Sequence, residues 1–510
     1  MISQSHIHKI FAERLSEEIR KGNIKNKDDL LKIKKRIAKE LGINVPQNSE
    51  ILPFVKDEKI KEILIRKPVR TISGVAIVAV MASPFHCPHG RCLPCPGNPP
   101  ESAQSYTGYE PASLRARRND YDPYLQVKDR LRQFSCIGHP SDKIELIVMG
   151  GTFPARDFLY QEWFIKRCYD AMNEINSTSL EEAKKINEKA KHRCVGLTIE
   201  TRPDWCRLQH VEKMLEFGTT RVELGVQILD DKILYEINRG HTVKDVMDAT
   251  RILKNAGFKV CYHIMPGLPS SNRENDIECF RKIFIDERFR PDMLKIYPTL
   301  VVKPSKLYEK WERGEYKAIR EEEAIDIISE MKKYVPEWVR IQRIERDIPS
   351  YLVEDGVKKS NLRELVQQRL QEEGARCRCI RCREIRDRKV DDFELRRRDY
   401  IASDGREIFL SIENGEMDLI IAYCRLRIAN NFAIVRELKV HGSMVEIGKR
   451  NDEKWQHKGF GKILIDKAEE IASKSKKERI FVLSGVGAKE YYSKLGYSDD
   501  GFYMSKNLCE

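Results

Sequence analysis

The stretch of sequence that decides the fold is residues 87–97, which read Cys87-Pro88-His89-Gly90-Arg91-Cys92-Leu93-Pro94-Cys95-Pro96-Gly97. Three cysteines stand in it, with four and then two residues between them, in a loop that prolines stiffen and glycines tighten. Three thiolates can hold three irons of a cubane iron–sulfur cluster and leave the fourth iron open to another ligand. The alternatives are a zinc site, with His86 or His89 as the fourth ligand, and three unrelated buried thiols.

An open iron is the property that a radical S-adenosylmethionine (SAM) enzyme needs, because SAM binds there. We therefore interpret Cys87, Cys92 and Cys95 as ligands of a 4Fe–4S cluster, with SAM as a second cofactor. The loop follows an apolar run, residues 75–82, which predicts a buried strand. Chemistry placed directly after a strand is typical of a β/α barrel.

The composition describes a soluble chain whose 510 residues give room for two or three domains. Charged residues make up 34% and hydrophobic residues 41%, and no stretch approaches ~20 continuous apolar residues, so no membrane span is expected. The N-terminus has no apolar signal-peptide core, so we expect a cytoplasmic location. The 14 cysteines indicate metal or redox chemistry rather than a disulfide framework.

The formal net charge of +13 points to a polyanionic partner, and much of this charge lies near the N-terminus. Residues 1–70 hold 17 Lys and Arg against 10 Asp and Glu, a net charge of +7. Apolar residues recur there at helical spacing, and the most basic segment contains Lys32, Lys34, Lys35 and Arg36. We predict that residues 1–74 form a basic helical region that contacts nucleic-acid phosphates; the alternative is a merely solvated face.

Residues 75–370 alternate short apolar runs with amphipathic stretches, which predicts parallel strands joined by crossover helices in a partial or full β/α barrel. The strands are expected at residues 75–82, 144–150, 194–201, 221–227, 259–267 and 292–298, with a further candidate at 339–344. After the second strand, Gly150 and Gly151 would let the backbone approach the amino group of SAM; an ordinary tight turn is the alternative.

Several polar residues lie at the carboxyl ends of the later strands. Glu200, Arg202, Glu223 and Gln227 would face the barrel mouth if strand alternation holds, or would form a buried ion-pair network. His263, on an apolar strand, is expected to be a core histidine rather than a ligand.

Residues 371–390 form a cysteine-rich linker with Cys377, Cys379 and Cys382 inside six residues. These cysteines are badly placed for disulfides with one another, and neighbouring arginines would lower their thiol pKa values, so a structural zinc site is predicted. A fourth ligand would come from elsewhere in the chain, and the alternative is a cysteine-bearing basic loop. Arginines 396–398 add a second basic zone.

Residues 391–510 change character, with expected strands at 407–413, 419–428, 432–440 and 480–484 around a helix at 461–474. The turn before this helix would bind a pyrophosphate through backbone N–H groups at the positive end of the helix dipole, and it contains Gln456, Gly459, Phe460, Gly461 and Lys462. The strand Glu437-Leu438-Lys439-Val440 before it would place coenzyme A there.

This order of elements, followed by the segment at 488–497, resembles the GNAT-type acetyltransferases. In them a tyrosine at the position of Tyr491 or Tyr492 lies near the thioester sulfur and can protonate the leaving thiolate. The alternative is that one of the two tyrosines only packs on the sheet.

A radical SAM barrel followed by an acetyltransferase domain resembles the Elongator protein 3 family, in its stand-alone archaeal form, over nearly the whole chain. The matching segments, besides the cysteine loop and the turn at 456–461, are residues 148–153, 198–204, 238–243, 434–438 and 484–487. The first cysteine spacing is often longer in the family, but all three thiols are present.

The resemblance implies a tRNA-binding enzyme that installs a carboxymethyl group on C5 of the wobble uridine, position 34. Acetyl-CoA would supply the carbon, and a radical derived from SAM would take a hydrogen from the acetyl methyl group before C–C bond formation and thioester hydrolysis. It also implies that Lys143 contacts acetyl-CoA or its acetyl group; by sequence alone this lysine is an exposed charge opening a strand. An external electron donor would reduce the cluster.

Two other functions are compatible with parts of the sequence. One is a protein lysine acetyltransferase whose iron–sulfur barrel is only structural, which would form acetyl-lysine without SAM. The other is a tRNA-binding scaffold, which would need neither the loop cysteines nor the glycines and tyrosines of the acetyltransferase domain. The oligomeric state is left open, and a homodimer is one arrangement.

Overall fold

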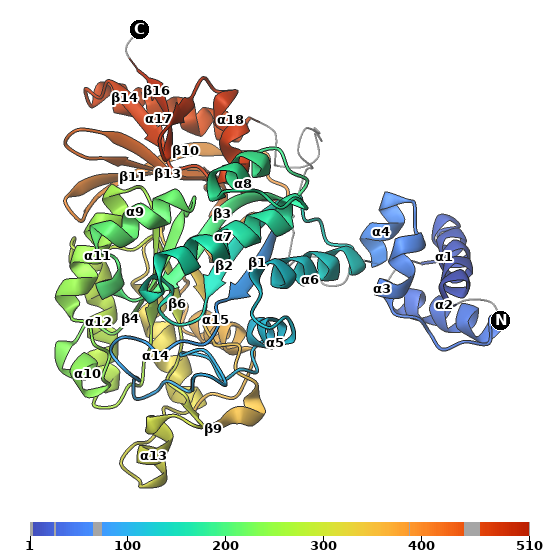
Figure 1. The fold of residues 1–510 in the computed structure, drawn as a ribbon, viewed down its shortest axis with the longest axis horizontal. Coiled ribbons are helices and arrows are strands. Elements are labelled where there is room, and N and C mark those ends of the chain that lie inside the picture. Colours follow the sequence, from blue (N-terminus) through green and yellow to red (C-terminus); the bar gives the residue numbers. More distant parts are fainter. Residues whose placement is uncertain (1–3, 25–26, 65–73, 387, 443–458, 509–510) are drawn as a thin grey trace.

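The computed structural model describes residues 4–24, 27–64, 74–386, 388–442 and 459–508. A small helical unit lies beside a larger body, and that body contains two sheets (Figure 1). The expected architecture, a parallel β/α half-barrel followed by an acetyltransferase α/β domain, is confirmed.

The N-terminal helices pack around an apolar core of their own. They are α1 (Gln4–Arg20), α2 (Lys27–Glu40), α3 (Asn48–Ile51) and α4 (Glu58–Leu64), with a 3₁₀ turn at Leu52–Phe54. Phe11, Leu15 and Ile37 are fully or almost fully buried in this core, because apolar residues at helical spacing form one stripe on each helix.

The first sheet has seven parallel strands in the order β1-β2-β3-β4-β5-β6-β8. They are β1 (Val75–Met81), β2 (Lys143–Met149), β3 (Arg193–Thr201), β4 (Arg221–Gln227), β5 (Lys259–Ile264), β6 (Met293–Ile296) and β8 (Arg340–Arg343). The strand expected at 259–267 ends at Ile264, just before Pro266, which has no N–H to donate.

The helices of the barrel region pack around this sheet, and the apolar stripes of most of them form the main core with its outer face. They are α5 (Pro111–Arg118), α6 (Pro123–Cys136), α7 (Phe158–Asn173), α8 (Leu180–Asn187), α9 (Leu208–Glu216), α10 (Asp231–Glu236), α11 (Val243–Asn255), α12 (Arg273–Ile285), α13 (Lys306–Glu312), α14 (Glu321–Lys333), α15 (Leu362–Glu372) and α16 (Ile380–Arg383). Two short strands, β7 (Val301–Val302) and β9 (Val353–Asp355), pair with each other. Along β2 every second side chain is buried, so the remaining ones, Glu145 among them, face the barrel interior.

The second sheet is mixed, in the order β10-β11-β12-β13-β14-β16-β15. Its elements are β10 (Glu394–Ala402), β11 (Gly405–Asn414), β12 (Leu419–Ile428), β13 (Ala433–Val440), α17 (Phe460–Lys474), β14 (Arg479–Val482), α18 (Lys489–Ser493), β15 (Ser498–Asp500) and β16 (Tyr503–Asn507). The basic zone expected at 396–398 is part of β10, where all three arginines form ion pairs with carboxylates. These carboxylates partly neutralise the second basic zone.

Buried charges join the two sheets. Arg436 on β13 donates to both oxygens of Asp292, at 2.8 and 2.6 Å, and to Glu407 Oε2 at 2.8 Å. Lys254 contacts the same two carboxylates, and all four side chains are essentially inaccessible to solvent. Close backbone packing adds to this junction, since a Cβ at Gly485 would lie 2.2 Å from the carbonyl oxygen of Val195 on β3.

Among the described residues, no helix combines the length and the apolar character that crossing a bilayer requires.

Candidate functional site: two cavities at opposite ends of one barrel

A cavity of about 170 Å³ lies at the carboxyl ends of the barrel strands, and the three loop cysteines line it together. Gly151 after β2, Gln227 at the end of β4 and Arg239 complete the wall nearest to the sulfurs. The sequence prediction that these cysteines meet at a strand end therefore agrees with the structure.

Hydrogen-bond donors point at the sulfur atoms of this loop. The backbone N–H of Ser105 donates to Cys95 Sγ at 3.1 Å, and Arg239 Nη1 lies 3.6 Å from Cys92 Sγ. Burial raises the pKa of the Cys92 thiol to about 11, against the opposing effect of Arg239. Donors aimed at sulfur suit thiolates, and an iron cluster would deprotonate these thiols outright.

The spacing of the three sulfurs distinguishes an iron–sulfur cluster from a single zinc ion as the group that they would bind. Zinc–sulfur bonds of about 2.3 Å would bring all sulfurs on one ion within about 4.6 Å of one another. Two groups of potential ligand atoms in the described chain lie within 4.8 Å of one another, and Cys87, Cys92 and Cys95 are in neither. This wider spacing suits several irons better than one zinc.

Gly150 and Gly151 allow the end of β2 to pass close to the cysteine loop. Both have positive φ angles, 120° and 81°, which L-residues with side chains rarely adopt. A Cβ at Gly150 would lie 3.1 Å from the backbone nitrogen of Ala82, and one at Gly151 would lie 3.6 Å from Cys87 Sγ. Gly151 borders the cavity, and Gly150 supports the turn behind it.

A chain of ion pairs fills the barrel interior below this cavity. Lys295 Nζ lies 3.0 Å from Glu200 Oε1 and also contacts Glu223. Glu223 Oε2 lies 2.8 Å from His263 Nε2, and its other oxygen lies 3.1 Å from Arg221 Nε. Both expectations hold in part: Glu200, Arg202 and Gln227 border the cavity at the barrel mouth. Glu200 and Glu223 also belong to the buried ion-pair network.

The network also accounts for a cluster of metal-type ligands in the barrel. Glu223, Cys261 and His263 have ligand atoms within 4.8 Å of one another. The ammonium of Lys295 already neutralises Glu223, so this group is charge-balanced without a cation. His263 is thus a partnered histidine of the barrel interior, as expected.

A second cavity, of about 550 Å³, lies at the opposite end of the barrel, where the strands begin. Barrel residues form one wall, among them Glu145, Arg221 and Lys259, and the acetyltransferase sheet forms the other, with Glu437, Leu438, Lys439 and Tyr492. The two cavities share none of the lining residues assigned to them in the described chain.

The acetyltransferase wall opens because two neighbouring strands diverge. β13 pairs with the parallel strand β14 only over Ala433–Val435, so within the described part of the chain the second half of β13 has no strand partner on that side. Glu437, Leu438, Lys439 and Val440 occupy this unpaired half, where backbone groups can bond a ligand in place of a strand.

Near this opening, helix α17 begins at a glycine in the left-handed region, Gly459 with φ 86°. Phe460 and Gly461 are buried at its first turn, whereas Lys462 is exposed and pairs with Asp466 at 2.7 Å. A Cβ at Gly461 would lie 2.5 Å from the hydroxyl of Tyr491, so glycine is needed there. Gln456 lies outside the described residues.

The two tyrosines of α18 occupy different surroundings. Tyr491 is 41% exposed and lies against the start of α17, whereas Tyr492 is 7% exposed and lines the second cavity. Burial is the main reason why the pKa of Tyr492 lies well above its usual value, so its hydroxyl keeps its proton at neutral pH.

Lys143 is half-buried at the first position of β2, the barrel end that faces the acetyltransferase sheet. Burial lowers the pKa of this lysine. Glu145, two residues later, lines the second cavity, whereas Lys143 is not among the residues that line it.

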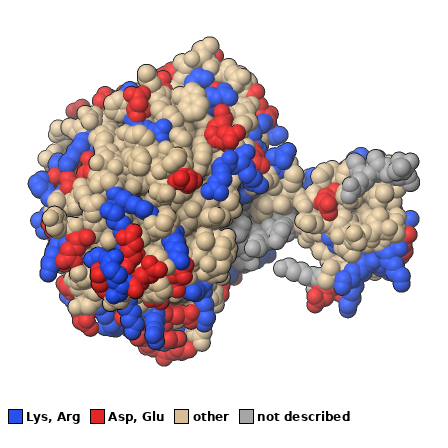
Figure 2. Space-filling model, turned by 60° about the horizontal axis from the view of Figure 1, so that its bottom comes forward, with Lys and Arg blue, Asp and Glu red and all other residues tan. Residues whose placement is uncertain are grey.

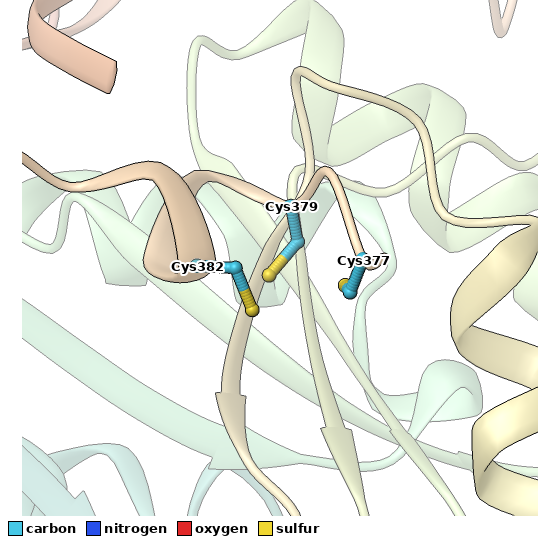
Figure 3. Close-up of side chains that lie close together, drawn as sticks. All are labelled: Cys377, Cys379 and Cys382. Carbon is cyan, nitrogen blue, oxygen red and sulfur yellow. The ribbon is translucent and has the colours of Figure 1, made fainter. Parts of the chain in front are cut away.

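The second cysteine group is compact. Figure 3 shows Cys377, Cys379 and Cys382 turning toward one another, and their sulfur atoms all lie within 4.8 Å of one another. Cys377 and Cys379 are buried, and Gln367 Oε1 lies 4.0 Å from Cys382 Sγ. Lys332 Nζ is buried nearby and has no hydrogen-bond partner among the described residues. These thiols could hold one metal ion.

Sequence reasoning did not single out Arg239, Lys295 or Lys259 as site residues. Arg239 stands in the segment 238–243, which matches the family pattern without indicating a role for each residue. Lys295 interrupts the apolar strand β6, and Lys259 is the first residue of β5. A charged residue within a buried strand is a usable signal, because it must find a partner or line a cavity.

The family models that match this chain occur along it in the same order as the structural units described above. The ELP3 N-terminal domain model matches residues 9–72, the Radical SAM superfamily model 84–283, the Radical_SAM C-terminal domain model 291–372, and the Acetyltransferase (GNAT) family model 375–497. The radical SAM match implies SAM and a 4Fe–4S cluster as cofactors, and the GNAT match implies acetyl-CoA.

Close relatives extend over the full length. A "tRNA uridine(34) acetyltransferase" of Methanocaldococcus jannaschii is 50% identical, over 100% of this chain and 99% of its own. The "Elongator complex protein 3" of Homo sapiens is 42% identical, over 94% and 93%. The solved structure of archaeal Methanocaldococcus infernus Elp3 with an N-terminal deletion is 48% identical, with a TM-score of 0.76, and covers 86% of this chain and 100% of that one. The chain therefore belongs to the Elongator protein 3 family.

Proposed function

We propose that this protein is a tRNA uridine(34) acetyltransferase that uses acetyl-CoA and SAM to build a carboxymethyl group on C5 of the wobble uridine. The observation that supports this most is that one barrel carries a cavity at each end. Three loop cysteines line the first cavity, and the buried Tyr492 and the unpaired half of β13 line the second. Relatives that carry this activity in their names match the chain over its full length.

In the first cavity, Cys87, Cys92 and Cys95 would hold the cluster, and the turn at Gly150-Gly151 would admit the amino group of SAM. When bound, the reduced cluster supplies the electron that cleaves SAM into a carbon radical. Arg239 keeps a positive charge beside Cys92, which favours the thiolate form.

In the second cavity, the unpaired backbone of Glu437, Leu438, Lys439 and Val440 would bond the pantetheine arm of acetyl-CoA in place of a strand. The start of α17, with Gly459, Phe460, Gly461 and Lys462, would bind the pyrophosphate. Gln456 belongs to the same predicted turn. Lys143 would contact the acetyl end from the barrel side.

The distance between the cavities sets a condition on the reaction. Arg221 borders the second cavity and Gln227 the first, and the strand between them spans roughly 20 Å. The acetyl unit must leave its own cavity to meet the uridine, so thioester cleavage should await bound tRNA.

The experiment that tests the function is nucleoside mass spectrometry of tRNA incubated with the reduced protein, SAM and acetyl-CoA. We expect 5-carboxymethyluridine at position 34 only when all components are present. Acetyl-lysine on added protein substrates, formed without SAM and with no change in the tRNA, would instead identify a protein acetyltransferase. An external electron donor and a homodimer stay predictions.

Replacing Tyr492 with phenylalanine should lower tRNA-dependent, multiple-turnover release of coenzyme A by ~10²-fold, the usual scale for a lost general acid. The affinity for acetyl-CoA should stay near the wild-type value, because the ring still fills its place in the wall. The measurement is coenzyme A release with and without tRNA.

The neighbouring Tyr491→Phe variant is the matched control. Its hydroxyl lies at the start of α17, so it should change the affinity for acetyl-CoA more than the rate. Equal rates in wild type and Tyr492→Phe would mean that Tyr492 only packs, and equal release without tRNA would disprove the coupling.

The N-terminal helices are proposed to bind tRNA, and the structure changes which lysines can do so. Figure 2 shows Lys and Arg side chains gathered along one edge of this unit. Lys34 is 7% exposed and donates to Asn48 Oδ1 at 2.7 Å, so the expectation that it contacts phosphates is wrong. Arg36 pairs with Glu18 at 2.8 Å, so among the side chains of α2 that the structure describes, Lys32, Lys35 and Lys39 are the exposed lysines.

Neutralising Lys32, Lys35 and Lys39 to glutamine should weaken tRNA binding and flatten its salt dependence. For every phosphate that the variant no longer neutralises, the slope of log affinity against log salt concentration should fall by roughly one. Lys34→Met is the control, because it should lower stability and leave the slope unchanged. An unchanged slope in the triple variant would place the RNA surface elsewhere.

Cys377, Cys379 and Cys382 are proposed to bind one structural zinc ion. Their close spacing fits one ion with bonds of about 2.3 Å. The buried, unpartnered ammonium of Lys332 suits a site that carries the negative charge of thiolates.

A further inference from the structure

The second cavity lies between two parts of the same chain, the acetyltransferase sheet and the barrel. In this chain the wall across from Tyr492 and Glu437 is the end of the barrel. The side chains that face the unpaired half of β13 therefore come from the barrel of the same chain. Lys259 of β5 is one of them, and it carries a primary amine.

Lys259 and Lys439, the two lysines that line the second cavity, differ from the buried Lys254 and Lys295, because their ammonium groups have no bonded partner among the described residues. Lys254 is fixed between Asp292 and Glu407, and Lys295 between Glu200 and Glu223. Among the described residues, the side chain of Lys259 forms no hydrogen bond and no ion pair, and the carboxylate with the largest effect on its pKa is Glu437 on the opposite wall. Its amine therefore faces the cavity instead of being held.

The environment of Lys259 also favours the nucleophilic, neutral form of the amine. Burial lowers its pKa to about 8, which Glu437 opposes and the Arg221 guanidinium reinforces. A desolvated lysine beside another cation is a recognised way to obtain a reactive amine near neutral pH. Lys439 lines the same cavity, but it belongs to the strand that would lie alongside coenzyme A.

We infer that Lys259 is an internal acetyl acceptor, which takes one acetyl group from bound acetyl-CoA when tRNA is absent. The inference rests on the proposed acetyl-CoA site. The Nζ lone pair attacks the thioester carbonyl, the C–S bond breaks, and the departing thiolate takes a proton from Tyr492. The proton lost by Nζ passes to Glu437 and back to Tyr492, so the products are acetyl-lysine and coenzyme A.

The reaction would stop by itself after one turnover. The amide nitrogen of acetylated Lys259 is no longer nucleophilic, and the added acetyl group occupies the wall that faces the thioester. Without tRNA the enzyme should therefore release about one equivalent of coenzyme A per chain and then stop, consistent with tRNA being required for repeated turnover.

The test is to incubate the full-length protein with acetyl-CoA carrying ¹³C in its acetyl group, without tRNA, and to map the label by peptide mass spectrometry. The isotope separates new acetylation from any acquired in the expression host. We expect labelling at Lys259 to be at least ~10-fold faster than at the exposed Lys358, and to slow in the Tyr492→Phe variant. Lys259→Arg should lose the label and keep the charge, whereas Lys358→Arg should still be labelled at Lys259.

Three outcomes separate this inference from the proposed function. Label at Lys439, or label spread evenly over exposed lysines, would overturn the inference. If calorimetry shows that acetyl-CoA binds but Lys259 stays unlabelled, the inference fails and the proposed function stands. If acetyl-CoA does not bind at all, the proposed function fails as well.

Discussion

Replacing Cys92 with alanine, alone or together with Cys87 and Cys95, is expected to abolish iron binding at the loop and the reductive cleavage of SAM. The loss should be complete rather than partial, because the three sulfurs line one cavity and each would hold a different iron. Acetyl-CoA binding should persist, since its cavity lies at the opposite end of the barrel. The measurements are iron content, visible absorption and release of 5′-deoxyadenosine.

The chain supplies two controls for this experiment. Cys136 is exposed and lies away from both cysteine groups, so Cys136→Ala should retain all of the iron. The second cysteine group should also keep its metal in the triple variant, which metal analysis would detect as about one zinc per chain. Wild-type SAM cleavage by the triple-alanine variant would show that the loop does not carry the cluster.

Replacing Arg436 with methionine should destabilise the protein by about 3–5 kcal/mol, the usual cost of removing one partner from a buried ion pair. Arg436 makes three short contacts with Asp292 and Glu407, and all three residues are at most 1% exposed. Without the guanidinium, two carboxylates share only the remaining cations inside the junction between the sheets. The measurement is the denaturant midpoint followed by far-UV circular dichroism.

The exposed Arg406 provides the comparison. It pairs with Asp399 at 2.9 Å, but its side chain is 41% exposed, so Arg406→Met should cost less than about 1 kcal/mol. Equal midpoints for both variants would show that the buried cluster does not stabilise the junction.

The pH dependence of stability has a definite sign at this cluster. Burial alone would raise the pKa of Asp292, but Arg436, Lys254 and Arg425 hold it well below the ordinary value of 3.8. A carboxyl group with a lowered folded-state pKa contributes stability that is present above its unfolded pKa and is lost as the pH falls below it. Arg436→Met should therefore weaken the acid dependence of unfolding below about pH 4.

The sequence by itself determined most of the local structure and the chemical class of each unit. Apolar runs placed the barrel strands to within a few residues, as in β4, whose bounds were predicted as observed. The cysteine spacing and the Gly459-Phe460-Gly461 turn predicted two ligand sites, because these features depend on residues close together in the chain. Helical periodicity likewise predicted the N-terminal unit.

The tertiary structure alone decided how these parts face one another. It placed the cysteine cavity and the cavity proposed for acetyl-CoA at opposite ends of the barrel, buried Lys34, and put arginines 396–398 into a paired strand. It also brought Arg436 to Asp292, 144 positions away, and Lys259 to the wall opposite Tyr492. The physical reason is that periodicity encodes which face of an element is apolar, whereas the partner of a buried charge is fixed only when distant elements pack together.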